Sequence, residues 1–216
     1  MKRQRILLAD DHTMILQAFK ELLEPEYDVV GTVADGRALL KAADELKPDI
    51  VILDVTMPLL NGLDAARRLK TTQPKIKLIF LIMNQDPGLA VEAFRIGASG
   101  YLFKTSVGAE FMIAVKEVAR GMSYVTPLIS EELGEGFRRN PANTPSIPKL
   151  TSRQREVLQL LAEGHSMKDA ASILKVTPRT IAFHKYQIMK KFQLGSNADL
   201  MQFAIEQGVV ALKIGP

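Results

Sequence analysis

Apolar positions along the first 120 residues follow two patterns in turn. Short apolar runs bounded by turn residues indicate strands, and apolar residues that recur every three or four positions indicate helices. The runs predict five strands, at residues 5–9, 29–34, 50–53, 77–82 and 100–103. The helical period predicts five helices, at residues 14–23, 36–46, 62–70, 88–96 and 109–118. Regular alternation of strands and helices is typical of an α/β domain with a parallel sheet.

Two of the predicted strands are apolar at successive positions. Residues 50–53 read Ile-Val-Ile-Leu, and residues 78–83 form the longest uninterrupted apolar run of the chain, six residues. Strands without a polar face are typical of a sheet that helices cover on both sides. A membrane-spanning helix needs ~20 apolar residues, so we expect no membrane partner.

The pattern changes after residue 120. Residues 121–148 are rich in Pro, Gly and Asn and are interpreted as a linker, in which residues 129–137 have the pattern of a short helix. The remaining residues predict four short helices, near 151–163, 166–174, 178–191 and 196–207. Their signals include a Thr151–Gln154 capping box, a left-handed stop at Gly164 and Pro178 after an N-cap Thr177. The predicted organisation is therefore an α/β domain at 1–120, a linker at 121–148 and an all-α helix-turn-helix domain at 149–216.

Charge is unevenly placed along the chain. The net charge is +4, yet residues 1–120 contain 16 Lys or Arg and 16 Asp or Glu, whereas residues 149–216 contain ten basic and five acidic residues. The excess positive charge therefore lies in the last third, which indicates a polyanion as the partner of that part. The chain has no cysteine, which excludes disulfides, thiolate zinc sites and cysteine catalysis. Together with the absence of a signal-peptide core near residue 1, this predicts a cytoplasmic protein.

Charged residues follow three of the predicted strands. Asp10 and Asp11 come directly after the first strand, Asp54 after the third and Lys104 after the fifth. The carboxyl ends of parallel strands meet at one edge of the sheet, so these side chains are expected to converge. Three carboxylates there favour Mg²⁺, a hard cation with oxygen ligands, and a carboxylate beside Mg²⁺ and lysine can accept a phosphoryl group. A single strand-end aspartate, such as Asp10 or Asp35, more often caps the next helix.

Residues 1–120 resemble a response-regulator receiver domain. The matching motifs are Asp10-Asp11, Asp54 followed by Met57-Pro58 and Asn61-Gly62, and Gly100-Tyr101-Leu102-Phe103-Lys104. The whole chain resembles the NarL/FixJ-like transcription factors, in which a receiver precedes a LuxR-type helix-turn-helix domain. The resemblance implies a flavodoxin-like sheet of five parallel strands in the order 2-1-3-4-5.

The resemblance also implies roles for the residues at the strand ends. Asp54 would accept a phosphoryl group from a histidine kinase. Asp11 and Asp54 would bind Mg²⁺ directly, Asp10 partly through water, and the backbone carbonyl of Thr56 would be the third protein ligand. Lys104 would pair with the phosphoryl group, and Tyr101 would change rotamer on activation.

Residue 82 departs from the receiver pattern. The family places Ser or Thr 22 residues before the lysine, and this chain has Ile82 there. A hydrogen bond to a charged group is worth roughly 1.5–3 kcal/mol, so its loss would reduce the conformational shift ~10- to 100-fold. Two alternatives remain open: Thr56 or Asn84 supplies the missing donor, or Ile82 is a core residue and the switch uses other contacts.

The predicted helix at 178–191 is basic and contains no acidic residue. Ile181, His184, Ile188 and Phe192 have core spacing, and the remaining face carries most of the cationic side chains. A helix that is apolar behind and cationic in front fits the major groove of DNA.

This domain resembles the LuxR-type motif at several places, namely Leu150-Thr151, Arg155 to Leu158, Ala162 to Gly164, Thr177 to Ile181, His184 and Ile188 to Lys191. The resemblance implies structural roles for Arg155 and Glu156, and base-facing positions for Ala182, Phe183 and Tyr186. It makes Arg179, Thr180, Lys185, Lys190 and Lys191 candidates for phosphate contacts. Phe183 and Tyr186 favour contacts to thymine methyl groups over bidentate readout of guanine. The alternative is that both aromatic side chains are buried, either in this domain or against the receiver.

The two other histidines of the chain, His12 and His165, have no metal-ligating neighbours in this interpretation. His12 is expected to begin a helix and His165 to lie in a turn, so neither is predicted to bind metal or to catalyse.

The leading hypothesis is a DNA-binding regulator, active as a homodimer and phosphorylated on Asp54. A regulator that works without phosphorylation is the alternative, favoured by Ile82. A phosphoryl-transfer enzyme is a third hypothesis, disfavoured because neither a Gly-rich phosphate loop nor a separate general base is evident.

Overall fold

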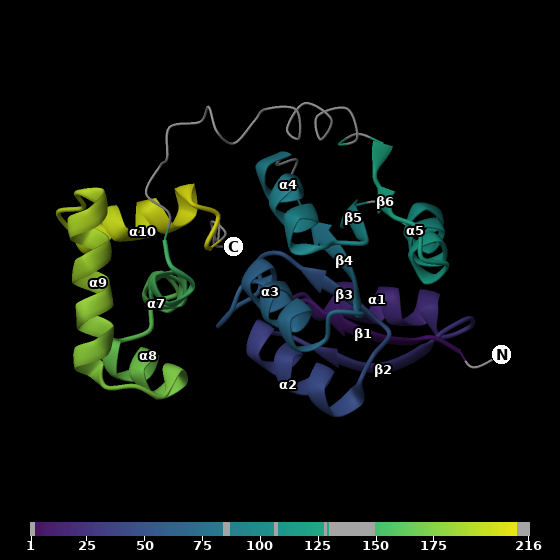
Figure 1. Ribbon diagram of the computed structural model, residues 1–216, viewed down its shortest axis with the longest axis horizontal. Helices are drawn as coiled ribbons and strands as arrows, with labels where there is room; N and C mark the ends of the chain where they lie inside the picture. Colours follow the sequence, from purple (N-terminus) through teal and green to yellow (C-terminus); the bar gives the residue numbers. More distant parts are fainter. Residues whose placement is uncertain (1–2, 84–86, 106–107, 128, 130–149, 211–216) are drawn as a thin grey trace. The chain divides into compact units, whose positions relative to one another are not determined.

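The computed structural model describes residues 3–83, 87–105, 108–127, 129 and 150–210 (Figure 1). The chain divides into two compact units, whose main parts are residues 1–57 with 62–144 and residues 145–216. Most of the predicted linker, 130–148, and the predicted short helix at 129–137 apart from Ile129 lie outside the described residues. Within the described ranges, no helix combines the length and the apolar character that a membrane crossing requires.

The first unit is built on one parallel sheet. Its strands are β1 (Arg5–Ala9), β2 (Asp28–Val33), β3 (Ile50–Asp54), β4 (Lys77–Ile82), β5 (Gly100–Phe103) and β6 (Tyr124–Val125). Their order is β2-β1-β3-β4-β5-β6, which confirms the predicted order 2-1-3-4-5. The sheet has one strand more than the five predicted, because β6 pairs in parallel with β5 and places Tyr124 opposite Gly100. A strand of two residues is too short to produce a visible alternation in the sequence.

Helices cover both faces of this sheet, as the apolar strands predicted. The helices are α1 (Thr13–Leu23), α2 (Gly36–Leu46), α3 (Gly62–Thr72), α4 (Pro87–Ile96) and α5 (Ala109–Ala119). In Figure 1, α1 and α5 lie on one side of the sheet and α2, α3 and α4 on the other. The core beneath α1 and α5 joins β1, β3, β4 and β5, and the rings of Phe19 and Phe111 stack with centroids 4.2 Å apart. All five residues of β3 are buried.

The second unit consists of four described helices, as predicted: α7 (Ser152–Ala162), α8 (Met167–Leu174), α9 (Pro178–Phe192) and α10 (Asn197–Glu206). Thr151 and Gln154 form the predicted capping box. Thr177 caps α9, whose first position is Pro178. Gly164 has a φ of +90°, a left-handed conformation that glycine adopts without strain and that ends α7 as predicted.

Helix α9 is anchored from behind by the residues with core spacing. Ile181 packs with α7 and α8, and Ile188 packs with α7 and α10. Phe192 lies against Phe203 of α10, with ring centroids 4.4 Å apart. His184, also predicted for this face, is partly buried. Burial lowers the pKa of its ring, and repulsion from the Arg153 charge lowers it further. Because these contacts all lie on one side of α9, its opposite side is left exposed.

The turn between β3 and α3 requires glycine at position 62. The Gly62 N–H donates to the Val55 carbonyl over 2.8 Å. A Cβ at this position would lie 2.0 Å from the backbone oxygen of Asp54, a rigid neighbour that cannot move aside. The close approach therefore fixes the backbone directly after Asp54.

We expect Gly62→Ala to destabilise the first unit by about 1–3 kcal/mol, because the new methyl group displaces the backbone of β3. Thermal unfolding followed by calorimetry measures this loss. Gly195→Ala is the matched control, since its Cβ would lie 3.5 Å from the nearest neighbouring atom, an Asp199 side-chain oxygen. Equal effects of the two substitutions would contradict the proposed crowding at Gly62.

Candidate functional sites

Four charged side chains meet at the carboxyl edge of the sheet. Asp10 and Asp11 follow β1, Asp54 ends β3 and Lys104 follows β5. Lys104 Nζ lies 2.8 Å from Asp10 Oδ2 and 3.0 Å from Asp54 Oδ2, and all three side chains are 1% exposed. The structure thus brings together the residues that the strand ends predicted. The lysine contacts are ion pairs, since Nζ and Asp10 Oδ2 do not meet hydrogen-bond geometry.

The cluster holds more negative charge than Lys104 balances. Three ionised carboxylates and one ammonium leave two negative charges, which a divalent cation would neutralise. Asp54 Oδ1 is buried and has no hydrogen-bond partner, although buried polar atoms usually have one. A buried, unpaired carboxylate oxygen among other oxygen donors fits a hard divalent cation such as Mg²⁺.

Thr56 contacts the same carboxylate. Its hydroxyl donates a hydrogen bond to Asp54 Oδ2 over 3.1 Å. The structure thus places a hydroxyl donor at Asp54, one of the two substitutes considered for the residue at position 82. Asn84, the other, lies outside the described residues.

The prediction that His12 lacks metal-ligating neighbours is wrong. Its Nδ1 lies 3.0 Å from Asp10 Oδ1 and 2.8 Å from Asp11 Oδ1. Ligand atoms of Asp10, Asp11, His12 and Asp54 all lie within 4.8 Å of one another. The adjacency Asp-Asp-His was the available signal, but it does not show which way the ring turns. The expectation that His12 precedes a helix is confirmed, because it is the N-cap of α1.

Asp35 and Asp10 separate the two roles that a strand-end aspartate can have. Asp35 caps α2 and accepts from the N–H groups of Arg37 and Ala38, each over 2.8 Å. Asp10 Oδ1 instead accepts from the His12 N–H over 2.9 Å, and its other oxygen faces Lys104. The capping alternative therefore holds for Asp35, whereas Asp10 belongs to the charged cluster.

Burial raises the pKa of the Asp54 carboxyl. Attraction to the Lys104 charge opposes this effect, the nearby Asp10 charge adds to it, and a hydrogen bond from the Thr56 backbone lowers the pKa. Because the folded-state pKa is raised, the contribution of Asp54 to folding is favourable in acid and is lost as the pH rises through the folded pKa. Ionised Asp54 therefore opposes folding at neutral pH when no cation is bound.

We expect Asp54→Asn to raise the Tm of the metal-free protein at neutral pH, because it removes a buried charge. A rise of ~3 °C corresponds to about 1 kcal/mol in a domain of this size. The difference should shrink as the pH falls and wild-type Asp54 becomes protonated. Calorimetry in a chelating buffer measures it, and Asp44→Asn, whose carboxylate is 80% exposed, is the control. A gain that is independent of pH would contradict this assignment.

Ile82 and Tyr101 are both buried. Ile82 is 3% exposed at the end of β4 and pairs with Phe103 of β5. Its carbonyl accepts from the Lys104 N–H over 2.7 Å. Tyr101 is 0% exposed, with its ring centroid 6.4 Å from that of Phe94 in α4. Residue 82 is thus part of the apolar core. It directly follows Leu81, the residue of β4 that pairs with Asp54.

The outer face of α9 is cationic and aromatic. Phe183 is 58% and Tyr186 is 62% exposed, so neither aromatic side chain is buried within the helical unit. Lys185 Nζ lies 5.9 Å from the Tyr186 ring centroid. Of the other predicted DNA contacts, Arg179, Lys190 and Lys191 are exposed, and Thr180 and Ala182 are half-buried.

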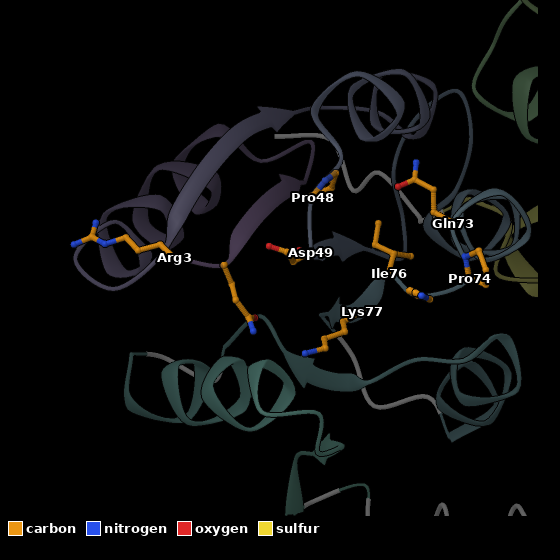
Figure 2. Close-up of a pocket in the computed structure, with 9 residues that line it drawn as sticks. Arg3, Pro48, Asp49, Gln73, Pro74, Ile76 and Lys77 are labelled. Atoms are coloured by element: carbon orange, nitrogen blue, oxygen red, sulfur yellow. The ribbon is translucent and has the colours of Figure 1, made fainter. Parts of the chain in front are cut away.

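A hollow of about 640 Å³ lies at the opposite edge of the sheet, lined by residues that include Arg3, Asp49 and Lys77 (Figure 2). Its charged groups have structural partners. Asp49 accepts from the Arg5 N–H, Lys77 donates to the Ala119 carbonyl, and Arg3 donates to the carbonyls of Glu24 and Pro25. These contacts tie β1, β3 and β4 to neighbouring segments, so we assign the hollow no role in binding.

Comparisons with known proteins agree with this architecture. A family model described as "Response regulator receiver domain" matches residues 6–116, and one described as "Bacterial regulatory proteins, luxR family" matches residues 148–204. The response regulator GacA of Pseudomonas aeruginosa is 29% identical over 209 residues, 95% of this chain and 97% of GacA. The oxygen regulatory protein NreC of Staphylococcus haemolyticus is 31% identical over 211 residues, 94% and 97% of the two chains.

A solved structure of the response regulator RcsB from Salmonella typhimurium has the same fold, with a TM-score of 0.64 and 23% identity over 98% of this chain and 100% of that chain. The receiver sheet with its acidic edge and the helical domain with its cationic helix define a two-domain response regulator. The chain belongs to the NarL/FixJ-like response regulators of two-component systems, with a LuxR-type DNA-binding domain.

Proposed function

We propose that this chain is a transcription regulator that a histidine kinase phosphorylates on Asp54, and that the phosphorylated form binds double-stranded DNA as a homodimer. The carrying observation is the buried Asp54 carboxylate, which has one unpaired oxygen and lies 3.0 Å from Lys104. Such a carboxylate can act as a nucleophile toward phosphorus. A DNA target implies a cytoplasmic location.

Each residue of the acidic edge has a proposed task in phosphoryl transfer. An oxygen of Asp54 would form the new bond to phosphorus as the bond from phosphorus to the kinase histidine nitrogen breaks and the histidine leaves. Lys104 lies where its charge can pair with the phosphoryl oxygens. Asp11, Asp54 and the Thr56 carbonyl would hold Mg²⁺ directly, and Asp10 would hold it partly through water. When bound, Mg²⁺ neutralises negative charge and orients the phosphoryl group.

The number of phosphoryl groups transferred per protein molecule distinguishes a regulator from an enzyme. A regulator takes up one phosphoryl group on Asp54 and retains it, whereas an enzyme releases many product molecules. Phosphate release from a small phosphate donor beyond slow hydrolysis of the labelled carboxylate would favour an enzyme. We therefore propose no enzymatic turnover.

We propose that the Thr56 hydroxyl couples phosphorylation of Asp54 to conformational change, in place of a hydroxyl at position 82. Ile82 offers no donor and is packed in the core, whereas the Thr56 hydroxyl already contacts Asp54 Oδ2. Retaining one donor at the carboxylate would preserve part of the coupling between phosphorylation and conformation. Removing the hydroxyl at Thr56 and adding one at position 82 should therefore have opposite effects on this coupling.

We expect beryllofluoride with Mg²⁺ to shift the mass of the protein from 23.9 kDa toward twice that value, because the mimic occupies the phosphoryl position on Asp54. Light scattering measures the mass. Asp54→Asn should abolish the shift, Thr56→Val should weaken it, and Ile82→Thr should strengthen it. A lost hydrogen bond of roughly 1.5–3 kcal/mol corresponds to ~10- to 100-fold in the dimerisation constant.

An unchanged mass with Mg²⁺-dependent uptake of beryllofluoride would overturn this coupling and support the second candidate, a DNA-binding regulator that works without phosphorylation. The apolar packing of Ile82, which is 3% exposed, favours that candidate. In that case the first unit would serve for assembly or partner binding.

The DNA-binding proposal rests on the outer face of α9. Basic side chains on one helix face attract the phosphate backbone, and the exposed Phe183 and Tyr186 can contact thymine methyl groups in the major groove. One small domain that carries few positive charges binds weakly, and a dimer on two half-sites doubles the contacts.

We expect Lys190→Ala to weaken binding to a random-sequence duplex and to reduce the slope of log affinity against log salt by about 1. Fluorescence anisotropy at several salt concentrations measures the slope. Lys41→Ala is the control, because it removes the same charge from the exposed surface of α2. Phe183→Ala should leave the slope unchanged and alter the sequences selected from a random pool. Equal slopes for wild type and Lys190→Ala would refute the phosphate contact.

A further inference from the structure

We propose that His12 is an additional ligand at the acidic edge and gives the site a preference for divalent transition-metal ions over Mg²⁺. The inference rests on the metal site of the proposed function and adds a nitrogen donor to it. The juxtaposition that carries it is the His12 ring nitrogen within 4.8 Å of ligand atoms of Asp10, Asp11 and Asp54.

The backbone fixes where the imidazole lies. The His12 N–H donates to Asp10 Oδ1 over 2.9 Å, which holds residue 12 against the end of β1 in an extended conformation, with φ −93° and ψ 98°. The side chain then turns back over the acid pair, so that Nδ1 reaches both carboxylates. The ring side chain is 55% exposed, which leaves an ion and its water ligands access from solvent.

The contacts around Nδ1 are incomplete without a cation. One ring nitrogen carries at most one proton, yet two carboxylate oxygens lie 3.0 Å and 2.8 Å away. The nearer oxygen, Asp11 Oδ1, makes no hydrogen bond, and neither does Asp54 Oδ1. A cation between these atoms would use the Nδ1 lone pair and both unpaired oxygens at once.

The spacing suits a single ion. Transition-metal ligands lie at ~2.0–2.2 Å, so two ligands on opposite sides of one ion are ~4.2 Å apart and adjacent ligands are closer. A set of four ligand atoms within 4.8 Å approaches that geometry with small side-chain movements. Three carboxylate oxygens of the cluster make no hydrogen bond: Oδ2 of Asp10, which faces Lys104, and Oδ1 of Asp11 and of Asp54.

The chemistry of the donor set explains the preference. Mg²⁺ takes oxygen ligands and retains water, so an imidazole adds little to its affinity. Co²⁺, Ni²⁺ and Zn²⁺ bind imidazole more strongly, and their affinities for nitrogen sites exceed that of Mn²⁺. His12 should therefore change the ratio between the two classes of ion and leave the affinity for Mg²⁺ nearly unchanged.

The test uses the full chain, without an affinity tag, at neutral pH. Co²⁺ is titrated by calorimetry and by its visible absorption, which reports the ligands around the ion, and Mg²⁺ is titrated by calorimetry. We expect His12→Gln to weaken Co²⁺ binding at least ~10-fold, to alter the absorption band and to change Mg²⁺ affinity less than ~3-fold. His12 makes no side-chain capping bond to α1, so the substitution removes no helix cap.

Two further variants locate the ion. Asp54→Asn should weaken both Co²⁺ and Mg²⁺, because it removes a shared ligand, and His165→Gln should change neither. An unchanged Co²⁺ affinity and spectrum in His12→Gln, or an equal loss of Co²⁺ and Mg²⁺, would overturn the role of His12 while the magnesium site stands. Failure of the wild type to bind either ion would overturn the magnesium site itself, and this inference with it.

Discussion

The structure of the first unit depends on one electrostatic constraint, the burial of two carboxylates, Asp10 and Asp54, against a single buried lysine. Asp10, Asp54 and Lys104 are each 1% exposed, and unpaired buried charges cost several kcal/mol. Parallel pairing makes the arrangement possible, because it delivers the ends of β1, β3 and β5 to one edge. The register that aligns Ala9 with Leu53 and Asp54 with Leu81 holds the acids at one level.

The negative charge of this site is not fully balanced by the protein, so an added positive charge would stabilise it. Lys104 neutralises part of the cluster, and burial still raises the pKa of Asp54. The remaining negative charge favours a divalent cation, and a bound cation would in turn favour the proposed phosphoryl group, which carries about −1.5 to −2 charges. The unfavourable electrostatics of the edge and the phosphoryl transfer proposed for it would thus have the same physical origin. Gly62 contributes by allowing the chain to pass directly over the Asp54 carbonyl.

Much of this architecture could be predicted from the sequence, because apolar runs and capping residues act locally. The apolar run at 50–53 identified the buried β3, and Thr151, Gly164 and Thr177 marked the helix ends correctly. The convergence of Asp10, Asp54 and Lys104 followed from topology. His12 was missed because the direction of its ring depends on the hydrogen bond between its own N–H and Asp10. The strand β6 was missed because two residues show no period.

The identity of residue 82 constrains how a signal can leave the acidic edge. A hydroxyl at this position would report the phosphoryl group directly by a hydrogen bond. Ile82 instead pairs with Phe103 and accepts the Lys104 N–H at its carbonyl, so its link to the site runs through the backbone. Movement of Lys104 toward a phosphoryl group would therefore pull on the end of β4 without any side-chain donor there. The proposed transmission through this strand end, with Thr56 as the hydroxyl at Asp54, would be mechanical, and its strength would depend on how tightly β4 and β5 are packed.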